Sequence, residues 1–391
     1  MNRRPEIDAL RAIAFSLLIL YHLGMLYVAG WEWHLKSTYT SEALQWPMLF
    51  VNRWRMDLIF LISGAATAFL MRRASMGGFV RQRLWRLLLP LAFGMAVVIP
   101  IQPYCQGVAN GLVEPGFLRF LGRYFTGYPW PRGSFDGWEW GFTWNHLWYL
   151  PYLLVYTLSL AMIEPWLRSP RALRLRERIE SLRGWRLLLY PALPLAVWTI
   201  ALQQRFPPTH DLVNDWHNHA VYFTVFLYGW LLADSDRIWK ELARLRRVSL
   251  AAALAAFGIL VGLALWRERF PWDGSLVVIW SVRCIYIWLA IAAILGWGHA
   301  VFDRPRPWIS WATQAVYPWY ILHQSLIVLL AYWLVPLRLG AIAEPALILA
   351  GTVGGCYFLH VAVIRNVRWL RPCFGLKSMP RAARSEGLVS T

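Results

Sequence analysis

The stretch IDALRAIAFSLLILYHLGMLYVA, residues 7–29, decides the fold class. It is longer than the roughly 20 mostly apolar residues that an α-helix needs to cross the hydrocarbon of a membrane. It also holds Asp8, Arg11 and His22 and lacks a small-residue cleavage site, which argues against a cleaved signal peptide. The segment therefore predicts a membrane span that stays in the mature protein.

Apolar segments of similar length recur along the chain. The other nine are 54–73, 84–102, 145–167, 187–203, 219–234, 248–266, 276–299, 314–335 and 341–364. The sequence thus predicts an all-α integral membrane protein, a bundle of about ten transmembrane helices. We expect one membrane domain, residues 1–371, and a basic cytoplasmic tail without fixed structure, residues 372–391.

The composition agrees with a membrane protein. Of the 391 residues, 58% are hydrophobic and 15% are charged, which is too apolar for an ordinary soluble domain. The 26 Trp suit rings that anchor helices at the two membrane interfaces. A net charge of +18 could suggest a nucleic-acid partner, but no nucleic-acid-binding module is present. We expect a lipid bilayer as partner and no nucleic acid.

The basic residues fall unevenly on the two sides of the predicted bundle. With a cytoplasmic N-terminus, 27 of the 39 Lys and Arg residues lie on the inside and ten lie on the outside. The inside residues occupy the N-terminus, 72–86, 168–186, 235–247, 300–313 and the C-terminal tail. Such a bias predicts both termini in the cytoplasm of a multi-pass protein of the bacterial inner membrane.

Cysteine and metal patterns are absent from the sequence. Cys105, Cys284, Cys356 and Cys373 are scattered without a CxxC spacing, and no HExxH links the histidines. We expect neither disulfides nor a metal site.

The first span carries the clearest functional signal. Arg11 and His22 are eleven residues apart, almost three helical turns, so they share one face about 16 Å apart along the axis. Asp8 lies one turn before Arg11 and can pair with it. Ionisable groups within a span usually mark function. The alternative is a snorkelling Arg and a His that bonds a neighbouring helix.

A second basic group precedes the third span in RQRLWRLLLP, residues 81–90. Arg83 and Arg86 are three residues apart and share a helix face. Paired guanidinium groups bind phosphate well, but plain positive-inside charge also explains them.

Further polar residues lie near the predicted outer face. Asp57 either orients a His or receives a proton, or it pairs with Arg53 or Arg55. The histidines in aromatic surroundings, each a candidate catalyst or an ordinary structural residue, are His34, His146 and His323.

Two long outer connections, 30–53 and 103–144, are rich in Trp, Gly and Pro with few charges. The second contains YPWPRGSFDGWEWGFTW. Such segments suit either stacking on sugar rings or a helix lying at the interface.

Together these motifs resemble the integral-membrane acyltransferase-3 superfamily. Its Arg–ten residues–His motif is matched by Arg11 and His22, and its RxxR pair before an apolar run ending in Pro is matched by Arg83, Arg86 and Pro90. Its Phe-x-x-Ser-Gly element is matched at 60–64. The chain is most similar to the branch of glucans biosynthesis protein C, the succinyltransferases of osmoregulated periplasmic glucans, through Trp33-His34 and Arg55-Met56.

The resemblance implies transfer of an acyl group, succinyl or acetyl, from cytoplasmic acyl-CoA to a sugar hydroxyl of a periplasmic glucan or another envelope glycan. It implies acyl-CoA as donor, a carbohydrate acceptor and no metal. The catalytic candidates are His22, Asp57 and His146. The candidates for binding acyl-CoA are Arg11, Arg83 and Arg86. The candidates for binding the substrate are His34, Arg55 and His323.

Two questions remain open at the level of sequence. His22 is either a general base towards the acceptor hydroxyl or the carrier of an acyl-histidine intermediate. Intramembrane Arg, Asp and His also line transport paths, so the rival class is a transporter or flippase for a glycan or lipid-linked sugar, although no two-fold repeat supports it.

Overall fold

The computed structural model describes residues 4–378, and this part of the chain is built from helices. The α-helices are α1 Pro5–Tyr27, α2 Gln45–Met71, α3 Met76–Phe93, α4 Ile101–Ala109, α5 Phe117–Tyr124, α6 Tyr149–Leu167, α7 Pro170–Glu180, α8 Trp185–Leu189, α9 Ala192–Leu202, α10 Trp216–Leu232, α11 Asp236–Arg269, α12 Ser275–Phe302, α13 Pro307–Leu334, α14 Ala343–Phe358 and α15 Leu370–Cys373. Short 3-10 turns are η1 Glu42–Leu44, η3 Asn145–Trp148 and η4 Val335–Leu337, and π-helical segments are η2 Gly94–Val98 and η5 Leu359–Ile364.

Nine helices within residues 4–378 are long and apolar enough to cross a membrane. They match nine of the ten predicted stretches. The remaining stretch, 219–234, corresponds to α10, whose 17 residues span about 26 Å at 1.5 Å per residue, slightly less than the hydrocarbon thickness. Large apolar side chains cover the exterior, among them Leu20, Val97 and Met162, which are 53%, 60% and 82% exposed. The predicted all-α membrane bundle is confirmed.

Two helix boundaries differ from the sequence prediction. α2 begins at Gln45, not near 54, so Arg53 and Arg55 lie inside the helix and not at its outer edge. α3 continues through the π-helical Gly94–Val98 into α4, which ends at Ala109 inside the predicted connection 103–144. Hydropathy drops where polar side chains enter a helix, but the helix itself continues because those side chains face neighbouring helices.

The predicted tail, 372–391, lies partly outside the described residues, which end at 378.

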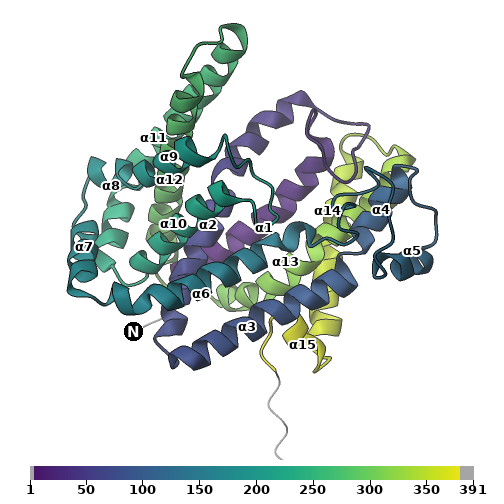
Figure 1. Ribbon diagram of the computed structural model, residues 1–391, viewed down its shortest axis with the longest axis horizontal. Coiled ribbons are helices and arrows are strands. Elements are labelled where there is room, and N and C mark those ends of the chain that lie inside the picture. The colour runs from purple at the N-terminus through teal and green to yellow at the C-terminus, as the bar shows by residue number, and fades with distance from the viewer. Residues whose placement is uncertain (1–3, 379–391) are drawn as a thin grey trace, which may run out of the picture.

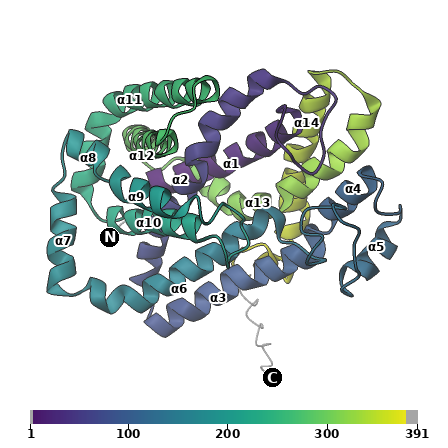
Figure 2. The same ribbon diagram turned by 45° about the horizontal axis from the view of Figure 1, so that its top comes forward.

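α1 occupies the middle of the bundle (Figures 1 and 2). It packs against α2, α12, α13 and α14, and α13 also contacts α4. α3 and α6 run side by side along one flank, while α11 and α12 form a long hairpin that projects from the bundle in Figure 1. The central position of α1 lets side chains from several helices surround Arg11 and His22.

The aromatic connection after α4 mostly packs against itself. Phe120, Tyr124, Trp130 and Phe135 are buried in one small cluster with Val113. The segment also holds the short helix α5, next to α4 in Figure 1. Most of these rings therefore stabilise the loop, while Trp140 and Phe142 remain exposed.

A close crossing between α2 and α10 depends on two glycines. A Cβ added to Gly64 would lie 1.8 Å from the carbonyl oxygen of Phe226, and one added to Gly229 would lie 1.7 Å from that of Leu61. Small residues permit such backbone contact between membrane helices. Gly64 belongs to the Phe-x-x-Ser-Gly element, and this close contact explains why a glycine stands at that position.

Replacement of Gly64 by Ala is expected to destabilise the protein, because the new methyl group meets backbone that cannot rotate away. Overpacking of this kind costs at least about 1–3 kcal/mol. The measurement is the temperature at which purified protein in detergent loses its monodisperse chromatographic peak. Gly258→Ala in α11 is the matched control, since a Cβ there meets nothing within 4 Å. Equal stability of the two variants would contradict the proposed crossing.

Candidate functional site

His22 on α1 forms a hydrogen-bonded pair with His323 on α13. Their rings are nearly parallel, 5.1 Å apart, and Nδ1 of His22 lies 2.9 Å from Nε2 of His323. Nδ1 of His323 lies 3.1 and 2.8 Å from the carbonyl oxygens of Trp319 and Tyr320, which can only accept. Nδ1 of His323 therefore carries the proton, and its Nε2 accepts from Nδ1 of His22.

This tautomer leaves the lone pair of His22 on Nε2. Among the described residues no hydrogen bond reaches Nε2, and the side chain of His22 is partly exposed. His323, only 1% exposed, is buried behind it. The pair thus presents one accessible basic nitrogen, held in a fixed orientation by a second imidazole.

His146 lies beside this pair but has both ring nitrogens occupied. Its Nε2 donates to the carbonyls of Tyr320 and Ile321 at 3.0 and 3.2 Å, and its Nδ1 accepts from Gln102 at 3.3 Å. Its ring centre is 6.4 Å from that of His22 and 5.1 Å from that of His323. In this arrangement His146 supports the segment of α13 that carries His323 and offers no free lone pair.

His34 joins the same region through a network of amides. Its Nδ1 donates to Gln106 at 2.8 Å and lies 3.1 Å from a carboxylate oxygen of Asp136, while Gln324 donates to its Nε2 at 3.0 Å. Burial alone would raise the pKa of Asp136, but hydrogen bonds from His34 and Gln106 outweigh it and lower the pKa below its usual value. This network ties the loop after α1 to α4 and α13.

A second layer of amides completes the network. Gln102 accepts at 2.9 Å from Asn145 and at 3.1 Å from Gln324, and it donates to Ser325 at 2.7 Å. Next to His34, Trp33 lies nearly parallel to His22, with ring centres 6.4 Å apart. Neutral amides and a flat indole are groups that suit sugar hydroxyls and ring faces.

The opposite end of α1 carries the basic group. Arg83 is 9% exposed, donates to the Thr67 hydroxyl, and has its Nε buried without a hydrogen-bond partner. Arg11 and Arg86 both interact electrostatically with Arg83. Arg11 also lies 3.8 Å from Asp8, as the spacing predicted. The structure thus brings Arg11, Arg83 and Arg86 together at one end.

Aromatic residues lie between the two ends. Phe15 makes edge contacts with Tyr149 and Tyr320, at 6.1 and 5.3 Å between ring centres. The Tyr149 hydroxyl lies 2.5 Å from that of Ser63, the serine of the Phe-x-x-Ser-Gly element. Between the arginines and the histidines, the site is therefore lined mostly by aromatic rings and a few buried hydroxyl groups.

In the described part of the chain, Asp57 makes no hydrogen bond with the histidine pair, whereas Arg55 is close enough to His22 to interact with it electrostatically. Within the described residues no hydrogen bond or ion pair joins Asp57 to a histidine, to Arg53 or to Arg55, and its Oδ1 is buried without a partner. Arg55 stacks on the ring of Tyr21, with its guanidinium carbon 3.4 Å from the ring centre.

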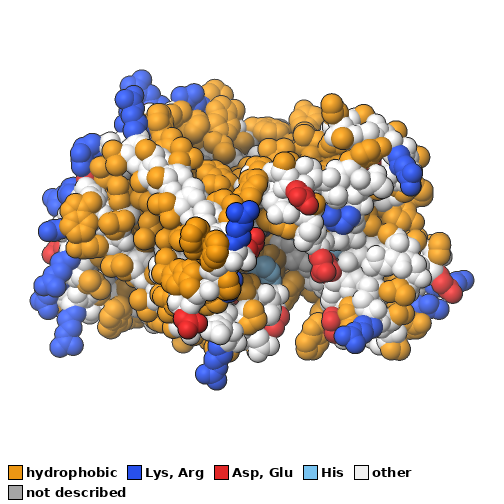
Figure 3. All heavy atoms as spheres, turned by 90° about the horizontal axis from the view of Figure 1, so that it is seen from above, with side chains coloured by type: hydrophobic (Ala, Val, Ile, Leu, Met, Phe, Trp, Pro, Cys, Tyr) orange, Lys and Arg blue, Asp and Glu red, His pale blue; other side chains and the backbone are white. Residues whose placement is uncertain are grey.

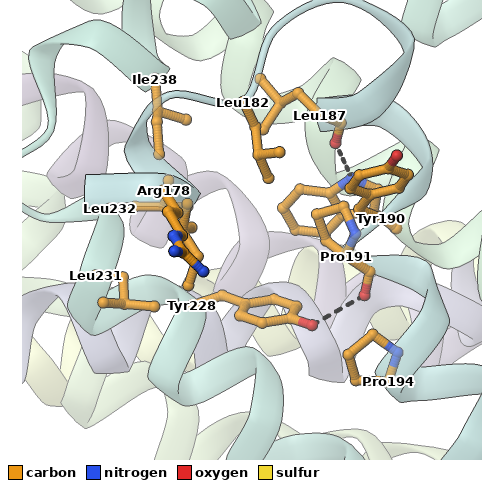
Figure 4. A pocket seen from close by; sticks show the side chains of 12 residues that line it. Arg178, Leu182, Leu187, Tyr190, Pro191, Pro194, Tyr228, Leu231, Leu232 and Ile238 are labelled. Atoms are coloured by element: carbon orange, nitrogen blue, oxygen red, sulfur yellow. Dashed lines mark hydrogen bonds between the residues drawn. The ribbon is translucent and has the colours of Figure 1, made fainter. Parts of the chain in front are cut away.

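The surface leaves a histidine reachable from outside. Figure 3 shows one largely hydrophobic face with a histidine side chain at the floor of a hollow. A separate apolar cavity of about 310 Å³ lies between α7 and α12, and Figure 4 shows its wall, with Tyr228 donating to the Pro191 carbonyl at 3.0 Å. None of the four histidines named above lines that cavity, so it is distinct from the site.

Sequence reasoning missed the amide network. Gln102 and Gln106 lie one helical turn apart on α4, but Gln324 is on α13 and Asp136 is in the loop after α5, so no local motif joins the four. One signal was available: Gln324 follows His323 directly inside an apolar span, where a polar side chain needs a partner.

Comparison with known proteins supplies the family. A family model described as an acyltransferase domain, acyltransferase-3, matches residues 4–361. The chain is 23% identical over 350 residues to the glucans biosynthesis protein C of Escherichia coli O6:K15:H31 (strain 536 / UPEC), covering 86% of this chain and 85% of that protein. No solved structure matches significantly. The resemblance inferred from the motifs is confirmed, and the chain belongs to the acyltransferase-3 family of membrane acyltransferases.

Proposed function

We propose that this membrane acyltransferase moves an acyl group, succinyl or acetyl, from cytoplasmic acyl-CoA to a sugar hydroxyl of a periplasmic glucan or another envelope glycan. The observation that carries the proposal is the pair of His22 and His323, which leaves one accessible basic nitrogen on His22. The acceptor and the donor are inferred from chemistry and from the related glucans biosynthesis protein C.

The transfer proceeds by attack of a sugar hydroxyl on a thioester. Nε2 of His22 takes the hydroxyl proton as the oxygen bonds to the thioester carbonyl carbon. The C–S bond breaks, and the imidazolium returns the proton to the thiolate, which leaves as CoA with a free thiol. His323 holds the other nitrogen of His22 and steadies the imidazolium as it forms. In the alternative route, His22 first accepts the acyl group itself.

Acyl-CoA binds across the length of α1. Arg11, Arg83 and Arg86 take the phosphates, because guanidinium groups hold phosphate through charge-assisted hydrogen bonds. The orphaned Nε of Arg83 supports this assignment, since a buried donor calls for an acceptor. The three-turn distance to His22 is comparable with an extended pantetheine arm, which would lie along Phe15 and Tyr149.

The acceptor binds at the amide network around His34 and Gln102. This network offers neutral donors and acceptors with the indole of Trp33 nearby, which favours a neutral sugar over a polyanion. The arginines then face the cytoplasm and the histidines face the periplasm. That orientation agrees with the predicted cytoplasmic termini in the inner membrane, and the donor and acceptor reach the site from opposite sides.

Loss of His22 is expected to remove the modification from the cell. Periplasmic and envelope glycans are analysed by mass spectrometry in a deletion strain, with wild type restored, and with His22→Ala at matched membrane abundance. We expect the acyl increment only with wild type, because His22 alone among His22, His34, His146 and His323 keeps a ring nitrogen free of hydrogen bonds. Full modification with His22→Ala would rule out His22 as the catalyst, and no change in any strain would contradict the proposed acceptor.

His323 is expected to act as a positioning residue for His22. In purified protein, His323→Leu should lower kcat at least about tenfold with little change in KM for acyl-CoA, since general-base catalysis contributes about 10²–10⁴ in rate. His323→Gln should retain much more activity, because its amide oxygen can accept from Nδ1 of His22. A kcat that is the same in both variants would show that the hydrogen bond is not needed.

Arg83 is expected to recognise the phosphates of the donor. Arg83→Lys keeps the charge but loses the planar fork, so KM for acyl-CoA should rise on the order of tenfold. The same acyl group on pantetheine, which lacks the phosphates, should be used equally well by wild type and variant. Arg81→Lys, at an exposed position nearby, is the control. A variant that is equally impaired with both donors would assign Arg83 a purely structural role.

A further inference from the structure

We propose that Arg55, with Arg53 and Arg283, forms a carboxylate-binding subsite beside His22 that selects acyl donors with a second carboxyl group. This inference rests on the proposed acyl transfer and specifies the chemistry of the acyl group. The subsite lies on α2 and α12, apart from the arginines assigned to the CoA phosphates.

Arg55 has unused hydrogen-bonding capacity. Within the described residues it makes no hydrogen bond or ion pair, and its Nε and Nη1 are buried without a partner. The Tyr21 ring, 3.4 Å from the guanidinium carbon, supports the cation through its π face but provides no acceptor in the guanidinium plane. Buried donors in native proteins are nearly always satisfied, so an acceptor from outside the chain is expected here.

The surroundings of Arg55 carry an excess of positive charge. Arg53 also has a buried Nε without a partner, and Arg53 and Arg283 are close enough to interact electrostatically. Arg283 donates to Gln203, a neutral amide. Asp57 acts electrostatically on Arg283, and Asp215 acts on Tyr222 together with Arg55 and Arg283. Buried arginine donors without an acceptor in a membrane interior favour a bound anion.

The position of Arg55 shows which anion fits. Tyr21, on which Arg55 stacks, precedes His22, and the two rings are 5.8 Å apart. Tyr21 thus contacts both groups, and Arg55 is close enough to His22 to interact with it electrostatically. The CoA phosphates belong near Arg11, about 16 Å farther along the helix, so they cannot reach it. A four-carbon dicarboxylic acyl group would place its thioester carbon at His22 and its free carboxylate at Arg55.

The anion that binds Arg55 could also come from an acidic substituent on the acceptor glycan. We favour the acyl group because its free carboxylate lies at a fixed distance from the reacting thioester carbon. Within the described residues, no arginine or lysine hydrogen-bonds to the amide network that we assign to the acceptor. The experiment therefore varies the donor and the acceptor separately.

The test is a competition between two donors on purified protein in lipid nanodiscs with a neutral glucan acceptor. Succinyl-CoA and butyryl-CoA have acyl chains of equal carbon number and differ in the terminal carboxylate. The readout is the ratio of succinyl to butyryl product by mass spectrometry. Wild type should favour succinyl, and Arg55→Met should lower the ratio at least about tenfold, the size expected for a lost charge-assisted hydrogen bond. Arg55→Lys should fall between the two.

Each outcome decides one question. Arg132→Met, at an exposed loop position, is the matched control and should keep the wild-type ratio. Transfer of neither group by wild type would overturn the proposed function itself. Transfer of both without preference, or an unchanged ratio in Arg55→Met, would overturn the subsite and leave acyl transfer intact. If Arg55→Met elutes as an aggregate, the test rests on Arg55→Lys alone. A ratio of succinyl to butyryl product in Arg55→Lys equal to that of wild type would then overturn the subsite.

The acceptor arm repeats the assay with a glucan that carries an anionic substituent. If Arg55 binds the acyl carboxylate, the loss of succinyl preference in Arg55→Met is the same with both acceptors. If the variant instead discriminates only between the neutral and the anionic acceptor, the anion belongs to the glycan and the proposal is overturned.

Discussion

A polar side chain inside a membrane must find its partner within the protein or in a ligand, because the hydrocarbon offers neither donors nor acceptors. This constraint explains how the site is built. His22 bonds His323, His34 bonds Gln106 and Gln324, and Arg83 bonds Thr67, each across different segments. The buried atoms left without partners include Nε of Arg83 and both Nε and Nη1 of Arg55, all of them donors. In the proposals above, the donor phosphates and the free carboxylate of the acyl group would provide acceptors for these two arginines.

The histidine pair also separates roles that sequence alone leaves equivalent. His34, His146 and His323 are all histidines in aromatic surroundings, but hydrogen bonds occupy both ring nitrogens of each. Only His22 keeps a nitrogen free among these four. The distinction arises from backbone carbonyls on α13, which fix the tautomer of His323 and through it that of His22.

The fold serves the site by bringing distant segments to one central helix. The Gly64 and Gly229 contact draws α10 against α2, and α2 in turn lies beside α1 with Arg55 over Tyr21. On the other side, α13 brings His323 against the same helix. α1 runs without interruption from Pro5 to Tyr27. The eleven-residue spacing of Arg11 and His22 along this helix therefore sets the separation between the basic end and the histidine end.

The sequence by itself determined the membrane class, the spacing of Arg11 and His22 and the family, because these depend on local hydropathy, helical period and short motifs. It misplaced the start of α2, since polar residues such as Arg53 and Arg55 lower hydropathy without ending a helix. Only the tertiary structure decided which histidine keeps a free nitrogen, which glutamines join it and which arginines lack partners. Those properties depend on contacts between residues as far apart as His22 and His323, and neither the period of a helix nor its composition encodes such contacts.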